Sequence, residues 1–174
     1  MARQILANLS GLSVNDTTQK HTARIIFGKD RNPQTSFVYT RLEKDFPGYK
    51  FELGKSYYRD EMPGEGGYVY AEPGMYSNVA LLDVASMHPT SIKILNLFGE
   101  YTPNFVALTE ARLAIKHQDY EAARKMLGGK LAPYLDNPDN AKALAYALKI
   151  VINIVYGLTS AKFDNPFRDM RNID

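Results

Sequence analysis

Hydrophobic and polar residues alternate at helical spacing in two long stretches of the second half of the chain. Within residues 104–128, apolar side chains stand among charged ones at positions 105, 108, 113, 115, 123, 126 and 127. Asn104 suits the start of such a helix, and Gly128 with Gly129 suits its end. Residues 139–158 are almost wholly apolar in their second half and predict a second long helix. A short Pro-rich turn joins the two, so we expect them to pack as an antiparallel helical hairpin.

A shorter helix is expected nearer the N-terminus, over residues 13–27. Its first residues include Asn15 and Asp16, which favour a helix cap, and apolar side chains follow up to Phe27. The next stretch, residues 28–63, is polar and rich in turn-forming residues, with the short strand-like sequence SFVYT inside it. We interpret it as an irregular connector.

A glycine-rich stretch, GEGGYVYAEPG, covers residues 64–74. The adjacent glycines Gly66 and Gly67 allow positive φ or a close approach of the backbone to another group. YVY at 68–70 then alternates as a strand. An ordinary glycine-rich hairpin explains the same pattern, so this stretch assigns no function by itself.

The stretch from 77 to 92, SNVALLDVASMHPTSI, predicts a strand, a turn and a short helix. Residues 79–82 are four consecutive apolar positions, which favour a strand buried on both faces or a short piece of buried helix. Pro89 stops a strand but suits the first turn of a helix, which we expect over residues 90–97. Asp83 ends the apolar run, where a carboxylate could bind a metal or could simply cap a helix or a turn.

Composition excludes several classes of site. The chain has 174 residues, of which 45% are hydrophobic, enough for one sizeable core or two small lobes. Its net charge of +2 is too small to indicate a nucleic-acid partner by bulk charge. The sequence has no cysteine, which excludes disulfides, thiolate zinc sites and cysteine nucleophiles, and its three scattered histidines argue against zinc.

Basic side chains recur at helical spacing on both long helices. Arg112 and Lys116 are spaced i, i+4 and share one face. Lys149, Asn153 and Tyr156 are spaced i, i+4, i+7 and share a face of the second helix. A helical hairpin can therefore direct cationic groups to one point, as binding of a triphosphate requires. The first pair alone equally suits a solvated basic face.

Lys149 and Asn153 interrupt an otherwise apolar window. Burying them without partners would be costly, so we expect them to face a cleft or a ligand. A carboxylate such as Asp83 that held Mg²⁺ beside a bound triphosphate would complete the minimum apparatus of phosphoryl or nucleotidyl transfer.

Taken in order, these motifs resemble those of the family B DNA polymerases, and most closely those of their phage replicative members. DVASMHPTSI at 83–92 resembles the palm motif Asp-x-x-Ser-Leu-Tyr-Pro-Ser. KIVINIVYG at 149–157 resembles the fingers motif Lys-x-x-x-Asn-Ser-x-Tyr-Gly. Arg112 and Lys116 stand between the two, where the family places its other triphosphate-binding pair. The glycine-rich stretch is similar to the segment that precedes the palm and touches the template-primer.

The resemblance implies a role for each matching residue. Asp83 would be catalytic and would bind two Mg²⁺ ions, one of them with the help of the main-chain carbonyl of Val84. The residues expected to contact the triphosphate are Ser86, Met87, Arg112, Lys116, Lys149 and Asn153. Those expected to select the sugar and to pack beside the nascent base pair are His88, Tyr156 and Gly157. Those expected at the template-primer are Gly66, Gly67 and Tyr68.

The sequence also departs from the family pattern. His88 stands where the family usually has the tyrosine that excludes ribonucleotides, and Thr90 and Ile154 each replace a serine. The second palm motif, Asp-Thr-Asp-Ser, has no counterpart, nor do the proofreading exonuclease and the thumb. The late aspartates stand in loop-like sequence at Asp164, Asp169 and Asp174.

We therefore expect an α/β chain of the α+β type, with a partial palm that contains a buried strand and an antiparallel two-helix fingers hairpin. Residues 1–63 would be an N-terminal helix and connector, and 64–99 the palm portion with the metal-binding Asp. Residues 100–160 would be the fingers hairpin, and 161–174 a return segment towards the palm.

The expected function is that of part of a DNA-directed DNA polymerase, which adds dNTPs to a primer 3′-hydroxyl by a two-metal mechanism. We expect this chain alone to be inactive, because it lacks the second carboxylate. Its partners would be primer-template DNA, dNTP and the remainder of the polymerase, in the same or a separate chain. Two alternatives remain: a non-catalytic nucleotide- or nucleic-acid-binding subunit of a split polymerase, and a degenerate helical interaction fragment.

The expected location is the cytoplasm, of the host cell if the protein is phage-encoded. The N-terminal residues lack the charged start and continuous apolar block of a secretory signal. No run appears long enough in the sequence pattern to cross a bilayer, and we expect no membrane partner.

Overall fold

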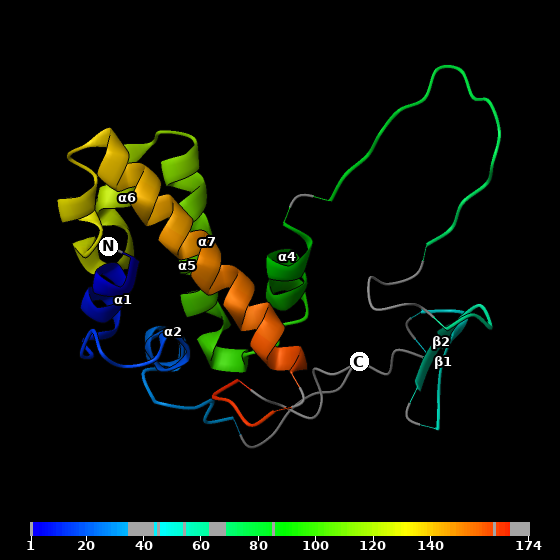
Figure 1. Ribbon diagram of the computed structural model, residues 1–174, viewed down its shortest axis with the longest axis horizontal. Coiled ribbons are helices and arrows are strands. Elements are labelled where there is room, and N and C mark those ends of the chain that lie inside the picture. Colours follow the sequence, from blue (N-terminus) through cyan, green and yellow to red (C-terminus); the bar gives the residue numbers. More distant parts are fainter. Residues whose placement is uncertain are drawn as a thin grey trace. The chain divides into compact units, whose positions relative to one another are not determined.

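A computed structural model of the protein describes residues 2–34, 44, 46–53, 55–62, 69–84, 86–161 and 163–167 (Figure 1). The helices and strands are α1 (Ala2–Ser10), α2 (Thr18–Phe27), β1 (Tyr49–Glu52), β2 (Lys55–Tyr58), α4 (Met87–Ile94), α5 (Thr102–Lys116), α6 (Tyr120–Lys125) and α7 (Pro138–Ser160). Short 3-10 turns occupy Gly99–Tyr101, Met126–Gly129 and Ala132–Tyr134. Helices together with a small antiparallel sheet make the chain α+β in the coarse sense that the sequence predicts.

The chain forms two compact units. The helical unit comprises Met1–Thr35 and Ala85–Ile173, and the β-hairpin unit comprises Ser36–Val84. The buried hydrophobic side chains of the described residues all lie in the helical unit, within residues 5–27 and 92–167. The helical unit therefore has its own hydrophobic core, whereas the described part of the β-hairpin unit has none.

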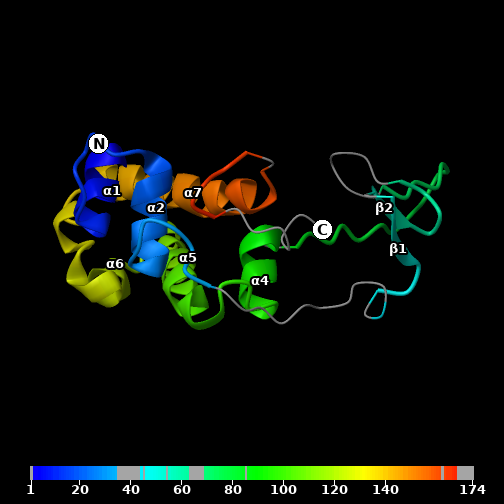
Figure 2. The same cartoon turned by 90° about the horizontal axis from the view of Figure 1, so that it is seen from below.

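The predicted helix near the N-terminus is confirmed as α2, with a different cap. Thr17, and not Asn15 or Asp16, caps it, because the Thr17 hydroxyl accepts a hydrogen bond of 3.2 Å from the backbone N–H of Lys20. Gly28 ends the helix in the left-handed conformation at φ 66°. The preceding helix α1 packs against both α2 and α7 (Figure 2).

The prediction of one helix over 104–128 is wrong, because the chain breaks after Lys116. Gln118 has a positive φ of 63°, and the Asp119 carboxylate then accepts a hydrogen bond from the N–H of Ala122 to start α6. Asp119 thus starts a new helix at a position where the hydrophobic pattern predicts that the first helix continues. The start also differs, since α5 begins at Thr102, and the Asn104 side chain donates to the carbonyl of Ile26 at 2.7 Å.

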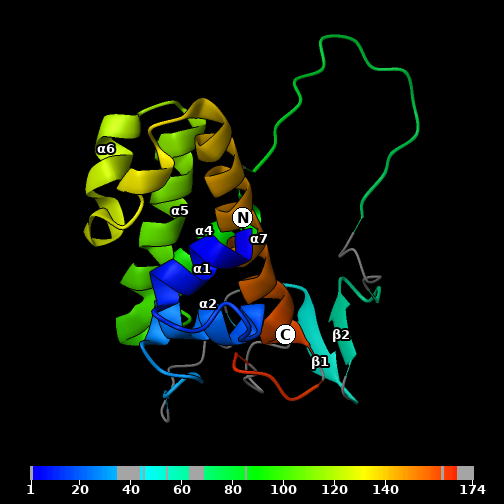
Figure 3. The same cartoon turned by 60° about the vertical axis from the view of Figure 1, so that its left-hand side comes forward.

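The second long helix and the antiparallel helical hairpin are confirmed. α7 spans Pro138–Ser160, with the Asn137 side chain accepting from the N–H of Asp139 at 2.8 Å. It packs along α5 and runs in the opposite direction (Figures 1 and 3). The buried face of α7 carries Leu144, Leu148, Val151 and Val155 at helical spacing.

The expectation that no run is long enough to cross a bilayer is wrong for α7. By length and composition alone, Pro138–Thr159 could span a membrane. The same properties belong to core helices of folded domains. In the helical unit this helix packs against α1, α2, α4 and α5.

The expected buried strand at 79–82 is also wrong in this structure. Residues 69–84 form neither helix nor strand (Figure 1). Val79, Leu81 and Leu82 expose 73%, 93% and 91% of their surface. A strand must exchange backbone hydrogen bonds with a neighbour. In the described part of this unit, β1 pairs with β2, from Tyr49 opposite Tyr58 to Glu52 opposite Lys55, and an isolated bridge joins Tyr58 to Glu61. Neither pairing involves residues 79–82.

An aromatic cluster holds the helical unit together. The fully buried ring of Phe98 lies 5.4 Å from that of Phe27, 5.9 Å from that of Phe105 and 6.2 Å from that of Phe167, measured between centroids. These rings come from α2, from the segment before α5, from α5 itself and from the chain after α7. Edge-to-face aromatic contacts add stabilisation beyond the burial of their area.

We predict that Phe98→Ala lowers the free energy of unfolding by about 3–5 kcal/mol, because it leaves a cavity among four elements. Urea denaturation of the purified chain measures this change. Phe51→Ala is the matched control, since Phe51 is exposed on β1 and its loss should change stability little. A loss of less than about 1 kcal/mol for Phe98→Ala would contradict the central place of this cluster.

Candidate functional site

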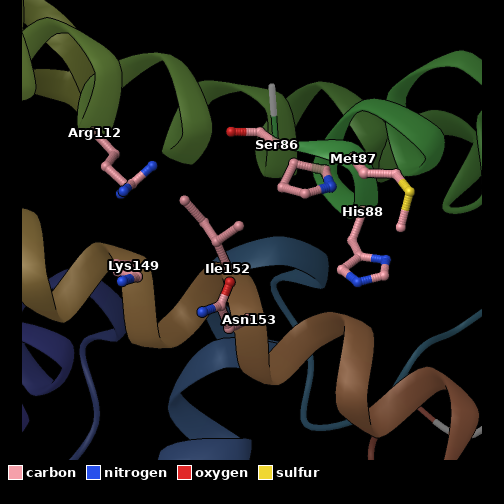
Figure 4. A pocket seen from close by; sticks show the side chains of 8 residues that line it. Ser86, Met87, His88, Arg112, Lys149, Ile152 and Asn153 are labelled. Atoms are coloured by element: carbon pink, nitrogen blue, oxygen red, sulfur yellow. The ribbon is translucent and has the colours of Figure 1, made fainter. Parts of the chain in front are cut away.

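A pocket of about 190 Å³ opens in the helical unit between the start of α4, the middle of α5 and the middle of α7 (Figure 4). We call it the α4–α5–α7 pocket. Its lining residues are Ser86, Met87, His88, Pro89, Arg112, Lys149, Ile152 and Asn153. Six of these eight are site residues that the sequence predicts, and they come from three segments far apart along the chain.

The first residues of α4 line the pocket. Ser86 is its N-cap residue, in the left-handed conformation at φ 52° and ψ 52°, and its side chain makes no capping hydrogen bond. The first N–H groups of a helix have no acceptor within the helix, and the helix dipole adds partial positive charge there. Met87 and His88 contribute such N–H groups, whereas Pro89 has none. This end of α4 is therefore suited to an anion.

Two cationic side chains reach the same pocket from opposite helices. Arg112 extends from α5 towards the space above α7, where Lys149 and Asn153 lie (Figure 4). Arg112 is half-buried and Lys149 is exposed. Among the residues that the structure describes, neither cation forms an ion pair. The described residues that line the pocket include no carboxylate, so they give it a positive electrostatic character.

The position of Lys149 and Asn153 follows from the packing of α7. The apolar side chains of this helix turn towards α1, α2, α4 and α5, which leaves a single polar side exposed. Both residues are exposed and line the pocket. The prediction that they face a cleft, made from the cost of burying them, is confirmed.

His88 and Tyr156 form a stacked pair between α4 and α7. Their ring centroids lie 3.5 Å apart with an interplanar angle of 17°. Since His88 lines the pocket and Tyr156 lies one turn beyond Asn153 on α7, this stack borders one side of the pocket. The resemblance to the polymerase motifs implies that both residues act in sugar and base-pair selection, and the structure brings their rings into contact.

Lys116 does not line the pocket, although the sequence predicts it to act with Arg112. It is the last residue of α5 and is exposed. It stands about 6 Å further along the helix than Arg112, at 1.5 Å per residue. Gly157 does not line the pocket either.

Other predicted site residues fall outside this pocket or outside the described chain. Asp83 and Val84 belong to the β-hairpin unit and are exposed. The predicted template-primer residues Gly66, Gly67 and Tyr68, the strand-like SFVYT at 36–40, and Asp169 and Asp174 lie outside the described residues.

The described residues do not by themselves form the metal centre that the resemblance implies. Among them, no three or more His, Asp or Glu side chains gather where they could hold one ion. Asp83 supplies a single carboxylate, and a two-metal site requires more than one. Asp164 is engaged with Arg31, whose pKa is raised above its ordinary value by the hydrogen bond to that carboxylate and by its charge.

Sequence reasoning missed two residues of the pocket, Pro89 and Ile152. Ile152 is almost fully buried, and it forms the floor between the polar residues of α7. Its position three residues after Lys149 and next to Asn153 is the signal that could have found it. Pro89 could have been found from its place in the first turn of α4.

Comparisons of this chain with protein-family models, with curated proteins and with solved structures found no match.

Proposed function

We propose that this chain is the palm-entry and fingers portion of a template-directed DNA polymerase, and that the α4–α5–α7 pocket binds the triphosphate of an incoming dNTP. The observation that carries the proposal is the convergence of Arg112, Lys149 and Asn153 with the N-terminus of α4 on one pocket. The order and spacing of the motifs that resemble the family B polymerases support it independently of the geometry.

The chemistry of the pocket suits a polyphosphate. Arg112 can donate two parallel hydrogen bonds to phosphate oxygens, and Lys149 adds a compact positive charge. The N–H groups of Met87 and His88 can bind the same anion from the third side. Because the described lining residues include no carboxylate that would compete for these groups, they can neutralise a ligand with several negative charges.

The groups beside the pocket suit the rest of a nucleotide. The His88–Tyr156 stack offers a flat wall next to the phosphate-binding groups, where a sugar and base would lie. We propose that His88 opposes a 2′-hydroxyl there, in place of the tyrosine usual in the family. Gly157 has no side chain one residue further along α7, which would allow a base pair to approach the backbone.

The metal and the second carboxylate would come with the remainder of the polymerase. Mg²⁺ is the cofactor that the resemblance implies, and Asp83 is the residue of this chain that would contribute to holding it. The described residues do not complete the site, so we assign no reaction step to the metal within this chain.

The β-hairpin unit supports the need for further polypeptide. Its described part has no buried hydrophobic side chain, and a two-stranded hairpin alone is marginally stable in water. The exposed apolar run at 79–82 has the pattern of a strand buried on both faces. We propose that the remaining palm, in the same or a separate chain, covers this run and fixes Asp83.

A second candidate function is a non-catalytic nucleotide-binding subunit. The observation that favours it is that the groups proposed to bind phosphate and the carboxylate proposed to bind metal belong to different units of the chain. The phosphate-binding groups are assembled within the helical unit, whereas Asp83 is the only palm carboxylate that the sequence comparison with the family identifies. Such a subunit would bind dNTP without turning it over.

We predict that Arg112→Ala and Lys149→Ala each weaken the binding of dATP by about tenfold or more. Hydrogen bonds to charged groups contribute about 1.5–3 kcal/mol, and 1.4 kcal/mol corresponds to a tenfold change. Isothermal titration calorimetry with dATP in the presence of Mg²⁺ measures the affinity.

Lys125→Ala is the matched control for charge, because Lys125 is exposed at the end of α6 and does not line the pocket. It should bind dATP as the parent protein does. If Arg112→Ala and Lys149→Ala also bind like the parent protein, the pocket is not a triphosphate site.

We further predict that the purified chain alone does not extend a primer. With a labelled primer-template, dNTPs and Mg²⁺, gel electrophoresis should show unextended primer, because one carboxylate does not support two-metal catalysis. Asp83→Ala controls for contaminating polymerase, which would extend the primer in both samples. Robust extension that is abolished by Asp83→Ala would contradict this prediction.

A further inference from the structure

The exposed surface of α7 is a single stripe that extends beyond the pocket. Between positions 142 and 157, the exposed residues are Lys142, Tyr146, Lys149, Asn153, Tyr156 and Gly157. Their spacings of four, three, four, three and one residues keep them within about 100° of arc at 3.6 residues per turn. We call this set the α7 stripe. Lys149 and Asn153 line the pocket, and Lys142 and Tyr146 continue the stripe towards the start of the helix.

The outer half of the stripe is basic and aromatic. Tyr146 exposes 63% of its surface between Lys142 and Lys149. After Asp139, α7 contains no acidic residue. Within the described part of the chain, neither Lys142 nor Lys149 takes part in an ion pair. These cations are thus available to a ligand outside the helical unit.

α5 carries a further cation beyond Arg112. Because α5 and α7 are antiparallel, the step from Arg112 to Lys116 runs in the same direction as the step from Lys149 to Lys142. Lys116 is exposed at the end of α5. The end of α5 that carries Lys116 lies towards the start of α7, because the two helices are antiparallel.

We propose that Lys142, Tyr146 and Lys116 bind single-stranded nucleic acid next to the pocket. Sequence-tolerant binding of single strands combines cations that follow the phosphates with aromatic rings on which bases stack. Lys142 and Tyr146 are four residues, about 6 Å, apart along the helix axis, so a strand that follows the stripe meets a charge and then an aromatic ring before it reaches the pocket. The identification of this strand as the template rests on the proposed function. The binding of a single strand to the α7 stripe does not depend on that function.

The test is fluorescence anisotropy with a fluorescein-labelled oligothymidylate of about 12 nucleotides, a length within reach of one binding surface. Tyr146→Ala should weaken binding by about tenfold, because stacking on one aromatic ring is lost. Lys142→Gln should weaken it and make its salt dependence shallower by about one phosphate contact.

The controls match exposure and residue type. Tyr76→Ala removes a tyrosine that is also 63% exposed but lies in the β-hairpin unit, and Lys125→Gln removes an exposed lysine of α6. Both should retain the parent affinity. Since all four side chains are exposed or at a helix end, thermal melts should show that each variant is folded.

Measuring dATP binding and oligothymidylate binding on the same variants tests the α7 stripe separately from the proposed function. Tyr146→Ala and Lys142→Gln should still bind dATP like the parent protein, because neither residue lines the pocket. Oligothymidylate binding that depends on Tyr146 in a protein without dATP affinity would retain the stripe and reject the proposed function. Unchanged oligothymidylate affinity in both stripe variants would overturn the inference, as would binding to phosphatidylserine vesicles but not to the oligonucleotide.

Discussion

The packing of α7 against α5 is the contact on which the rest of the site depends. α7 buries apolar side chains against four other helices, and this leaves one polar stripe at the surface. The antiparallel arrangement then brings Arg112 of α5 over Lys149 and Asn153 of α7. Without that contact, these groups would be separate charges on two solvated helices. The aromatic cluster around Phe98 joins the start of α5 to the end of α2.

Parts of this arrangement could be predicted from the sequence, because burying certain polar residues in an apolar helix has a clear energetic cost. Lys149 and Asn153 could be placed in a cleft because their burial inside an apolar helix would be unfavourable. α7 and the helical hairpin followed from a long apolar periodicity with a clear turn before it. Ser86, Met87 and His88 could be placed beside the helices only through the resemblance, since no local pattern relates residues 86–88 to residue 149.

The remaining features depend on competition that a sequence pattern does not resolve. Helix 104–128 satisfies the periodicity, but the left-handed Gln118 and the cap at Asp119 favour two helices over one. Residues 79–82 satisfy the pattern of a buried strand, yet burial requires a neighbour, and the described part of their unit supplies no core. Lys116 shares a helical face with Arg112 but stands one turn beyond the pocket. The spacing of residues predicts which face of a helix they share, but only the packing of the helices determines which of them lie at the pocket.

The measurement that tests the account most directly is a titration of the ¹⁵N-labelled chain with dATP, followed by amide chemical shifts. Binding of the triphosphate in the α4–α5–α7 pocket predicts that the largest changes map to Met87, His88, Arg112 and Lys149. These residues are separated in sequence, so a shared response would show that one ligand contacts all three helices. Shift changes confined to other parts of the chain, or no change at millimolar dATP, would contradict the assignment of this pocket to a nucleotide.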